Sequence, residues 1–370
     1  MPVFLKSIGF SVLLIGILEG VAEAVAGLSK SYFGKMSDAY GKRLPFVQLG
    51  YSLSAISKPM MALFIYPAWI FFSRTIDRIG KGIRTGARDA LLSDEATAAT
   101  KGRIFGFHRS MDTFGAVLGP LIALIYLYFY PNQYKTLFYL AFIPGLLAII
   151  TSSLVKEKKK STTHFSKTAL ANIFSFVSYW KQSSPAYKKL VTGLLLFALF
   201  NSSDVFLLLK MKETGMDDTA VIGIYIFYNL VYALAAYPLG IIADKIGLKK
   251  IFISGLVIFA AVYAGFAINN NQLIFILLFF LYGLYAAATE GIAKAWISNI
   301  ADSKEVATAI GTYSGFQSIA ALIASSMAGF IWFTFGAAPA FIMSAFATLA
   351  VIFYLSSARF HKKEILNNAV

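Results

Sequence analysis

The chain has 370 residues, of which 58% are hydrophobic and 14% are charged, and its mean hydropathy is +0.69. A soluble protein of this length would carry about 25% charged residues, so the composition argues against a water-soluble protein and indicates a chain whose solvent is largely lipid. The sequence has no cysteine, which excludes disulfides, thiol nucleophiles and thiolate metal sites, and its three histidines have no metal-ligand spacing. We therefore expect no metal and no cofactor.

Taken in chain order, apolar runs of about 20 residues predict eleven membrane-spanning helices. Their expected limits are 8–30, 44–65, 67–90, 104–129, 134–154, 187–209, 219–238, 250–268, 272–296, 306–333 and 337–357. A cleavable signal peptide is the alternative for the first 26 residues, but Glu19 and Glu23 are atypical of one.

The formal net charge of +15 would indicate a nucleic-acid partner in a soluble protein, but here it follows the loops. One set of loops, including 35–43, 74–109 and 156–160, holds most of the Lys and Arg, whereas the opposite loops carry little beyond Lys6, Lys135, Lys210 and Lys212. Cytoplasmic loops of membrane proteins accumulate basic residues. The pattern therefore predicts an outside N-terminus and a cytoplasmic C-terminus for this chain, without a nucleic-acid partner.

The longest polar stretch, 156–186, is predicted to be a cytoplasmic linker with a short amphipathic helix at 168–181 on the membrane surface. It would separate an N-terminal transmembrane bundle, 1–155, from a six-helix C-terminal bundle, 187–358, and a cytoplasmic tail, 359–370. The two halves resemble each other at an offset of 205 or 206 residues, in the pairs Gly34 and Gly240, Arg88 and Lys294, and Gly106 and Gly311. Such a duplication is the usual build of secondary transporters, whose substrate site lies between the halves near mid-membrane.

The repeated loop carries the first family resemblance. Residues 34–43 read GKMSDAYGKR and residues 240–250 read GIIADKIGLKK. This resembles the major facilitator superfamily, which carries G-x-x-x-D-x-x-G-[RK]-[RK] after its second helix and a weaker copy after its eighth. Gly34, Asp38, Gly41, Lys42 and Arg43 fill the first copy, and Gly240, Asp244, Gly247, Lys249 and Lys250 fill the second with one extra residue. The resemblance implies a gating latch in which the aspartate meets a helix N-terminus or an arginine.

Residues 74–94, RTIDRIGKGIRTGARDALLSD, resemble the fourth helix of a bacterial subgroup of uncharacterised permeases that reads D-R-x-G-K-G-x-R-T-x-x-R-D-A-L. Arg74, Asp77 and Arg78 belong to this stretch. The chain departs from the subgroup at Gly86-Ala87, where Ala-Pro is usual, and from the wider superfamily at Asp77-Arg78, where Gln-Gly is usual. The resemblance implies a bacterial cytoplasmic membrane protein.

A third match is the spacing of Gly106, Gly115, Gly119 and Pro120, which is similar to the fifth helix of the superfamily's antiporters, although Ala123-Leu124 replaces their Gly-Gly. It predicts a flat, kinkable helix face that packs closely against its partner, and it favours export by antiport. The family has twelve helices in two pseudo-symmetric bundles, and two of them precede the first loop motif. Only one precedes Gly34, so we expect that the first helix is missing, through either a misassigned start or a natural eleven-helix chain.

Ionisable residues inside predicted spans cost roughly 2.5–3.5 kcal/mol each on insertion scales, so each needs a partner or a function. Glu19 and Glu23 share one helix face, and Lys58 is a candidate counter-ion for them. Arg109 with Asp112, and Glu290 with Lys294, have the spacing of ion pairs within one helix, which would be structural. Glu19, Glu23 and Asp204 lack a local partner of opposite charge and are the candidates for a proton-coupling carboxylate. Asn229, Tyr232 and Gln317 line the cavity in this hypothesis, or simply pack.

The sequence thus predicts an all-α integral membrane protein that works as a secondary transporter by alternating access, with proton-coupled efflux of a small organic solute as the first hypothesis. An uptake carrier or uniporter of the same fold, and a non-transporting membrane sensor, are the alternatives. No catalytic triad, metal cluster or phosphate-binding loop indicates an enzyme. We expect a monomer in the lipid bilayer that draws its energy from a proton gradient.

Overall fold

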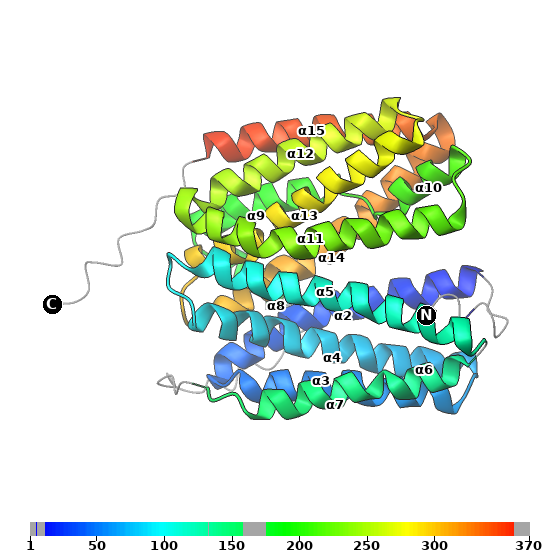
Figure 1. Ribbon diagram of the computed structural model, residues 1–370. Helices are drawn as coiled ribbons and strands as arrows, with labels where there is room; N and C mark the ends of the chain where they lie inside the picture. Colours follow the sequence, from blue (N-terminus) through cyan, green and yellow to red (C-terminus); the bar gives the residue numbers. More distant parts are fainter. Residues whose placement is uncertain (1–4, 6–11, 132, 158–174, 359–370) are drawn as a thin grey trace. The chain divides into compact units, whose positions relative to one another are not determined.

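The structure is a computed structural model, and it describes residue 5 and residues 12–131, 133–157 and 175–358. The regular elements in this part of the chain are all α-helices (Figure 1). In chain order they are α2 Val12–Tyr40, α3 Leu44–Leu63, α4 Pro67–Asp94, α5 Lys101–Phe129, α6 Tyr134–Leu140, α7 Phe142–Ser153, α8 Ser175–Gln182, α9 Pro185–Ala198, α10 Val205–Glu213, α11 Asp218–Ile246, α12 Leu248–Ile268, α13 Gln272–Ile300, α14 Val306–Phe335 and α15 Ala337–Ser357.

Each of the eleven predicted ranges contains helix, but several limits differ. The helices α2, α4 and α11 continue for 4 to 10 residues past their predicted ends, because polar residues of the loop motifs extend each helix beyond its apolar run. The fifth predicted range is interrupted at Ala141, and the sixth is broken between α9 and α10.

Seven helical stretches in the described residues are long and apolar enough to cross a membrane, judged by length and composition. They are α5, α6 with α7, α11, α12, α13, α14 and α15. The count of eleven spans and the missing first helix stay predictions.

Local sequence sets several helix ends. The Ser184 hydroxyl accepts a hydrogen bond from the N–H of Tyr187 at 3.2 Å, and Pro185 opens α9. The Asp217 carboxylate accepts one from the N–H of Ala220 at 2.7 Å at the start of α11. Gly247, with φ 106°, joins α11 directly to α12 in a conformation that residues with a side chain rarely adopt.

The described chain forms two compact units. Unit 1 lies within Met1–Leu91, Pro120–Gln182 and Asp302–Ser318, and unit 2 within Leu92–Gly119, Ser183–Ala301 and Ile319–Val370. The units differ from the two predicted halves of the chain, because the first part of α14 packs with unit 1 and the first part of α5 packs with unit 2.

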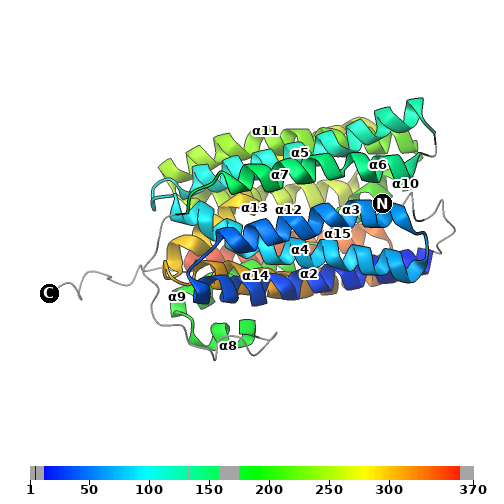
Figure 2. The same ribbon diagram turned by 90° about the horizontal axis from the view of Figure 1, so that it is seen from below.

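In unit 1, α3 packs against α6 and α7, and α3 and α4 lie side by side in both views (Figures 1 and 2). A Cβ on Gly50 of α3 would lie 2.6 Å from the carbonyl oxygen of Gly80 of α4, so the two backbones are in direct contact. Small residues permit this close packing of membrane helices.

The linker contributes α8 to unit 1. This helix packs against α2, Tyr179 is buried, and the Trp180 ring meets the Phe316 ring edge-on at 5.8 Å. The predicted linker helix is therefore present in its described part, but that part is packed against protein; residues 168–174 lie outside the described residues.

In unit 2, α13 packs against α11 and α12, and α12 packs against α15. Buried aromatic rings fill the space between these helices, and the rings of Phe259 and Tyr263 stack at 4.0 Å. On the outside, large apolar side chains such as Phe353 (76% exposed) and Leu234 (65%) face away from the protein. Exposed apolar surface of this extent fits lipid as the surrounding solvent.

Candidate functional site

The first loop motif holds the start of α14. The Asp38 carboxylate accepts hydrogen bonds from the backbone N–H and the hydroxyl of Thr308, both at 2.6 Å, and forms an ion pair with Arg43. Thr308 lies in the first turn of α14, where unpaired N–H groups and the positive end of the helix dipole favour a carboxylate. The Asp38 and Arg43 side chains are 7% and 4% exposed, so water screens these contacts little.

The motif glycines permit this contact. A Cβ on Gly34 would lie 2.5 Å from the carbonyl oxygen of Ala307, so α2 and α14 touch through their backbones. Gly41 follows the end of α2 with φ 64°, in the left-handed region that favours glycine. The geometry expected of the motif, an aspartate against both a helix N-terminus and an arginine, is present.

The linker binds the same loop. The Glu157 carboxylate accepts hydrogen bonds from the backbone N–H groups of Arg43 (2.6 Å) and Leu44 (3.0 Å), which are the first donors of α3. Sequence reasoning missed this contact, because the partners are 113 and 114 residues apart.

Acidic groups gather near this loop. Burial raises the pKa of Glu305, and the Asp302 and Asp38 carboxylates raise it further. Burial and the carboxylates of Glu305, Asp38 and Asp302 likewise raise the pKa of Tyr179 on α8.

The second loop motif makes the equivalent contact in unit 2. The Asp244 carboxylate accepts hydrogen bonds from the backbone N–H groups of Gly102 (2.7 Å) and Arg103 (2.8 Å), in the first turn of α5. A Cβ on Gly240 would collide with the carbonyl oxygen of Gly102. Lys249 of the same motif donates hydrogen bonds to carbonyl oxygens at the end of α15, those of Ser356 (2.9 Å) and Ala358 (3.0 Å).

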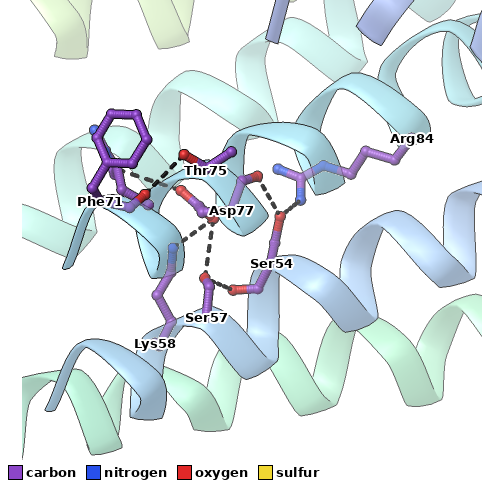
Figure 3. A network of polar contacts seen from close by, with 8 residues as sticks. Ser54, Ser57, Lys58, Phe71, Thr75, Asp77 and Arg84 are labelled. Carbon is purple, nitrogen blue, oxygen red and sulfur yellow. Dashed lines mark hydrogen bonds and ion pairs between the residues drawn. The ribbon is translucent and has the colours of Figure 1, made fainter. Parts of the chain in front are cut away.

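A polar network joins α3 and α4 (Figure 3). The Lys58 ammonium lies 2.8 Å from one Asp77 carboxylate oxygen, and the Arg74 guanidinium lies 3.4 Å from the other. Arg84 donates to the Ser54 hydroxyl at 2.9 Å. Arg78, half-buried on α4, adds its positive charge to the field at Asp77.

This network gives Lys58 a partner that the sequence spacing did not predict. Lys58 was the candidate counter-ion for Glu19 and Glu23, whereas its ion-pair partner in the structure is Asp77. The reason is that α4 runs alongside α3, which sequence spacing alone did not reveal. The side chains of Glu19 and Glu23 lie outside the described part of the chain, so their role stays a prediction.

A second network in unit 2 surrounds Arg109 of α5. Its guanidinium donates to the Tyr232 hydroxyl of α11, and it forms ion pairs with Asp112 (3.4 Å) and with Glu290 of α13 (3.3 Å). The predicted pair of Arg109 with Asp112 is present, with Glu290 as a further partner that sequence spacing missed. Glu290 reaches Arg109 because α5 and α13 approach closely at Gly291, and the expected pair of Glu290 with Lys294 along α13 stays a prediction. Lys294 is half-buried on α13.

Asp204 lies in the break between α9 and α10, which was predicted as one continuous span. Its carboxylate accepts a hydrogen bond from the Tyr282 hydroxyl at 2.6 Å, and the Tyr228 hydroxyl also interacts with it. Three residues earlier, the Asn201 amide nitrogen donates to the Tyr285 hydroxyl at 3.0 Å. Among the described residues no Lys or Arg pairs with Asp204, so its sequence-based description as a carboxylate without a cationic partner holds.

Sequence reasoning missed the tyrosines around Asp204, namely Tyr228, Tyr263, Tyr282 and Tyr285. Tyrosine at a span position is as often packing as function, and only the recurrence of Tyr282 and Tyr285 on one stretch of α13 could have drawn attention to them. Asn229 donates its amide hydrogen to the backbone carbonyl of Tyr225 at 2.9 Å, which is a local contact within α11.

The glycines of α5 behave differently from one another. A Cβ on Gly106 would lie 2.5 Å from the carbonyl oxygen of Ala236, so the close packing predicted here is present. A Cβ on Gly115 or Gly119 would meet no described atom within 4 Å, and both residues are exposed, so close packing is wrong at these two positions. Pro120 lies inside α5 without ending the helix.

The comparisons with known proteins agree with this arrangement. A family model described as Major Facilitator Superfamily matches residues 1–227 and 195–368. An uncharacterised MFS-type transporter of Methanocaldococcus jannaschii is 33% identical over 341 residues, which are 90% of this chain and 83% of that protein. The quinolone resistance protein NorA of Staphylococcus aureus is 24% identical over 218 residues, 59% of this chain and 55% of NorA.

Two solved structures share the fold. The transporter FucP in its outward conformation has a TM-score of 0.78 at 11% identity, covering 96% of this chain and 92% of FucP. The human organic anion transporter MFSD10 has a TM-score of 0.73 at 16% identity, covering 95% of this chain and 87% of MFSD10. At these identities the likeness concerns the fold alone. With the family model matching nearly the whole chain and a relative above 30% identity over nine-tenths of it, this multi-pass membrane protein belongs to the Major Facilitator Superfamily of transporters and is not an enzyme.

Proposed function

We propose that the chain is a secondary active transporter of the cytoplasmic membrane that exports a small organic solute in exchange for protons. The observation that carries the proposal is Asp204, a carboxylate at a helix break with tyrosine neighbours and no cationic partner among the described residues. Such a group binds a proton when its surroundings are dry and releases it when water reaches it. The partial similarity to NorA, a resistance protein, supports the direction of export.

A proton bound at Asp204 would also affect the network around Arg109. Glu290 lies in the field of Asp204 and also holds Arg109, so a change of charge at either carboxylate alters the other's surroundings. We propose that protonation near Asp204 is transmitted to α5 through this pair of carboxylates.

The two loop aspartates supply the gates in this proposal. Asp38 holds the start of α14 and Asp244 holds the start of α5, each through two hydrogen bonds to a first helical turn. Alternating access would break one of these capping contacts as the accessible side of the membrane changes.

The test begins with a search for the solute, using the rise in melting temperature that a bound ligand gives the purified protein. The solute is then loaded into proteoliposomes, and its efflux is followed with and without an imposed pH gradient. Two modes are compared: solute exchange without a gradient, and net transport driven by protons.

We expect the wild type to show both modes and Asp204→Asn to keep exchange but lose the response to the pH gradient. Asp217→Asn is the matched control, because Asp217 is exposed in the same unit and asparagine caps a helix equally well. Flux that ignores the pH gradient would indicate a uniporter, proton-driven accumulation would indicate uptake, and binding without flux would indicate a sensor. Each of these outcomes contradicts the proposal.

A further inference from the structure

The break between α9 and α10 leaves a row of backbone acceptors without partners. The hydrogen bonds around the break lead to the carbonyl oxygens of Phe197, Ser203 and Asp204. Within the described residues, no hydrogen bond leads to the carbonyl oxygens of residues 199–202. The break lies about midway between Pro185 and Glu213, where unpaired backbone groups are costly unless protein, water or an ion satisfies them.

Side-chain oxygens with unused capacity lie at the same place. The Asn201 amide oxygen is buried and accepts no hydrogen bond, although its amide nitrogen is bound to Tyr285. Tyr263 is 0% exposed, and its hydroxyl interacts with Ser202 and Tyr282 but has no hydrogen bond of good geometry. Two unsatisfied oxygens at one buried spot need an explanation.

The charge at the break is a single negative one. Asp204 supplies the carboxylate, and the described residues contain no cluster of three or more Asp, Glu, His or Cys that would hold a divalent metal. A divalent ion would call for a larger set of charged oxygen ligands or a well-formed octahedron. One carboxylate with neutral carbonyl and hydroxyl oxygens instead fits a small monovalent cation, and unwound backbone at a broken membrane helix binds such ions in other transporters.

From this geometry we propose that the α9–α10 break is a binding site for a small monovalent cation such as Na⁺. The Asp204 carboxylate is the anchor, with the Asn201 amide oxygen, the Tyr263 hydroxyl and the carbonyl oxygens of residues 199–202 as the available ligands. The inference rests on the proposed function in one respect: the same carboxylate is the one proposed to carry the proton, so the two cations exclude one another there.

The groups that face Asp204 set the background for this competition. They are Tyr282, Tyr285 and Glu290 on α13, Tyr225 and Tyr228 on α11, and Tyr263 on α12. All are neutral or acidic, so none of them supplies the positive charge that the site would bind.

The experiment compares the purified full chain in NaCl and in choline chloride at equal ionic strength and at a pH of about 8, where a carboxylate is ionised. Choline has the same charge but is too large to fit among the oxygen ligands of the six-residue break. We expect Na⁺ to raise the melting temperature by at least about 2 °C in a saturable way, because a ligand that binds only the folded protein stabilises it.

Two variants locate the site. Asp204→Asn should abolish the Na⁺ shift. Tyr263→Phe removes one hydroxyl from the aromatic core and should raise the Na⁺ concentration that gives half of the shift at least several-fold. Asp217→Asn, the exposed control, should keep the full shift. If Asp204→Asn does not fold, the wild-type comparison and Tyr263→Phe still decide the matter.

Equal melting temperatures in NaCl and choline chloride would overturn the proposal, and so would a Na⁺ shift that survives Asp204→Asn or is unchanged in Tyr263→Phe. These outcomes are separate from failure of the proposed function. A protein that shows proton-driven export without a Na⁺ shift refutes only the cation site, whereas a Na⁺ shift without proton-driven flux refutes only the proton coupling.

Discussion

Asp38→Asn should loosen the contact between α2 and the start of α14. The carboxylate takes two hydrogen bonds of 2.6 Å from Thr308 and pairs with Arg43. Hydrogen bonds to a charged group contribute about 1.5–3 kcal/mol each. Asparagine keeps one acceptor oxygen but not the charge, so we expect a loss of about 2–3 kcal/mol, which shifts the opening equilibrium about 30- to 150-fold.

The absence of native cysteine makes this shift measurable by labelling. Ser31→Cys in α2 is the reporter, because Ser31 is 1% exposed, faces Gly311 of α14, and its hydroxyl forms no hydrogen bond that the change would break. A maleimide reaches this thiol only when α2 and α14 separate. Where opening equilibrates faster than labelling, the labelling rate of Asp38→Asn should rise by the same factor of about 30 to 150.

Asp302→Asn provides the control in the same reporter background. Asp302 is exposed, and asparagine can still accept the hydrogen bond from the N–H of Lys304. Its labelling rate should stay at the wild-type value. Unchanged labelling in Asp38→Asn would refute the reasoning, since the capping bonds would then not hold α14; an equal rise in Asp302→Asn would assign the effect to loop charge in general.

Three further changes test other parts of the structure by thermal unfolding of the purified protein. Gly106→Ala places a Cβ 2.5 Å from a backbone carbonyl oxygen and should lose about 1–3 kcal/mol, whereas Gly115→Ala on the same helix should be neutral or gain up to about 1 kcal/mol; equal effects would contradict the packing described for α5. Asp77→Asn should destabilise the folded protein by about 3 kcal/mol, and Lys58→Gln by about 1 kcal/mol, because two cations share the Asp77 carboxylate. A larger loss in Lys58→Gln than in Asp77→Asn would show that the carboxylate is not the centre of the network. Glu305→Gln should be more stable than the wild type at a pH of about 8, because the raised pKa of Glu305 means that the fold disfavours the ionised carboxyl. The difference should vanish below a pH of about 4, where the wild-type carboxyl is protonated in both the folded and the unfolded protein. A difference that does not change with pH would exclude this cause.

The parts of the structure that the sequence predicted are local ones. The glycine and aspartate spacing of 34–43 encodes a turn next to a helix end, and the apolar runs encode helices, so both could be read from a few neighbouring residues. The pair of Arg109 with Asp112 is of the same kind, because three residues along a helix bring two side chains together.

The contacts that escaped prediction depend on which helices are neighbours. Lys58 pairs with Asp77, and Glu290 with Arg109, across helices that are adjacent only in the fold. The break at 199–204 escaped for a different reason. Apolar stretches on both sides of Asn201–Asp204 keep the average hydropathy of a continuous span, and hydropathy does not register where backbone hydrogen bonding stops.

Each of the two motif loops takes part in one further tie, and the two ties have opposite chemistry. In unit 1 the chain beyond α7 holds the start of α3, where unpaired N–H groups call for an acceptor, and Glu157 supplies it. In unit 2 the motif lysine, Lys249, holds the end of α15, where unpaired carbonyl groups call for a donor. Both ties therefore join a motif loop to the chain at the end of a helix, α7 or α15, through side chains of opposite charge. In unit 1 the residue that makes the tie, Glu157, belongs to the linker and binds next to Arg43, the ion-pair partner of the Asp38 carboxylate that holds α14.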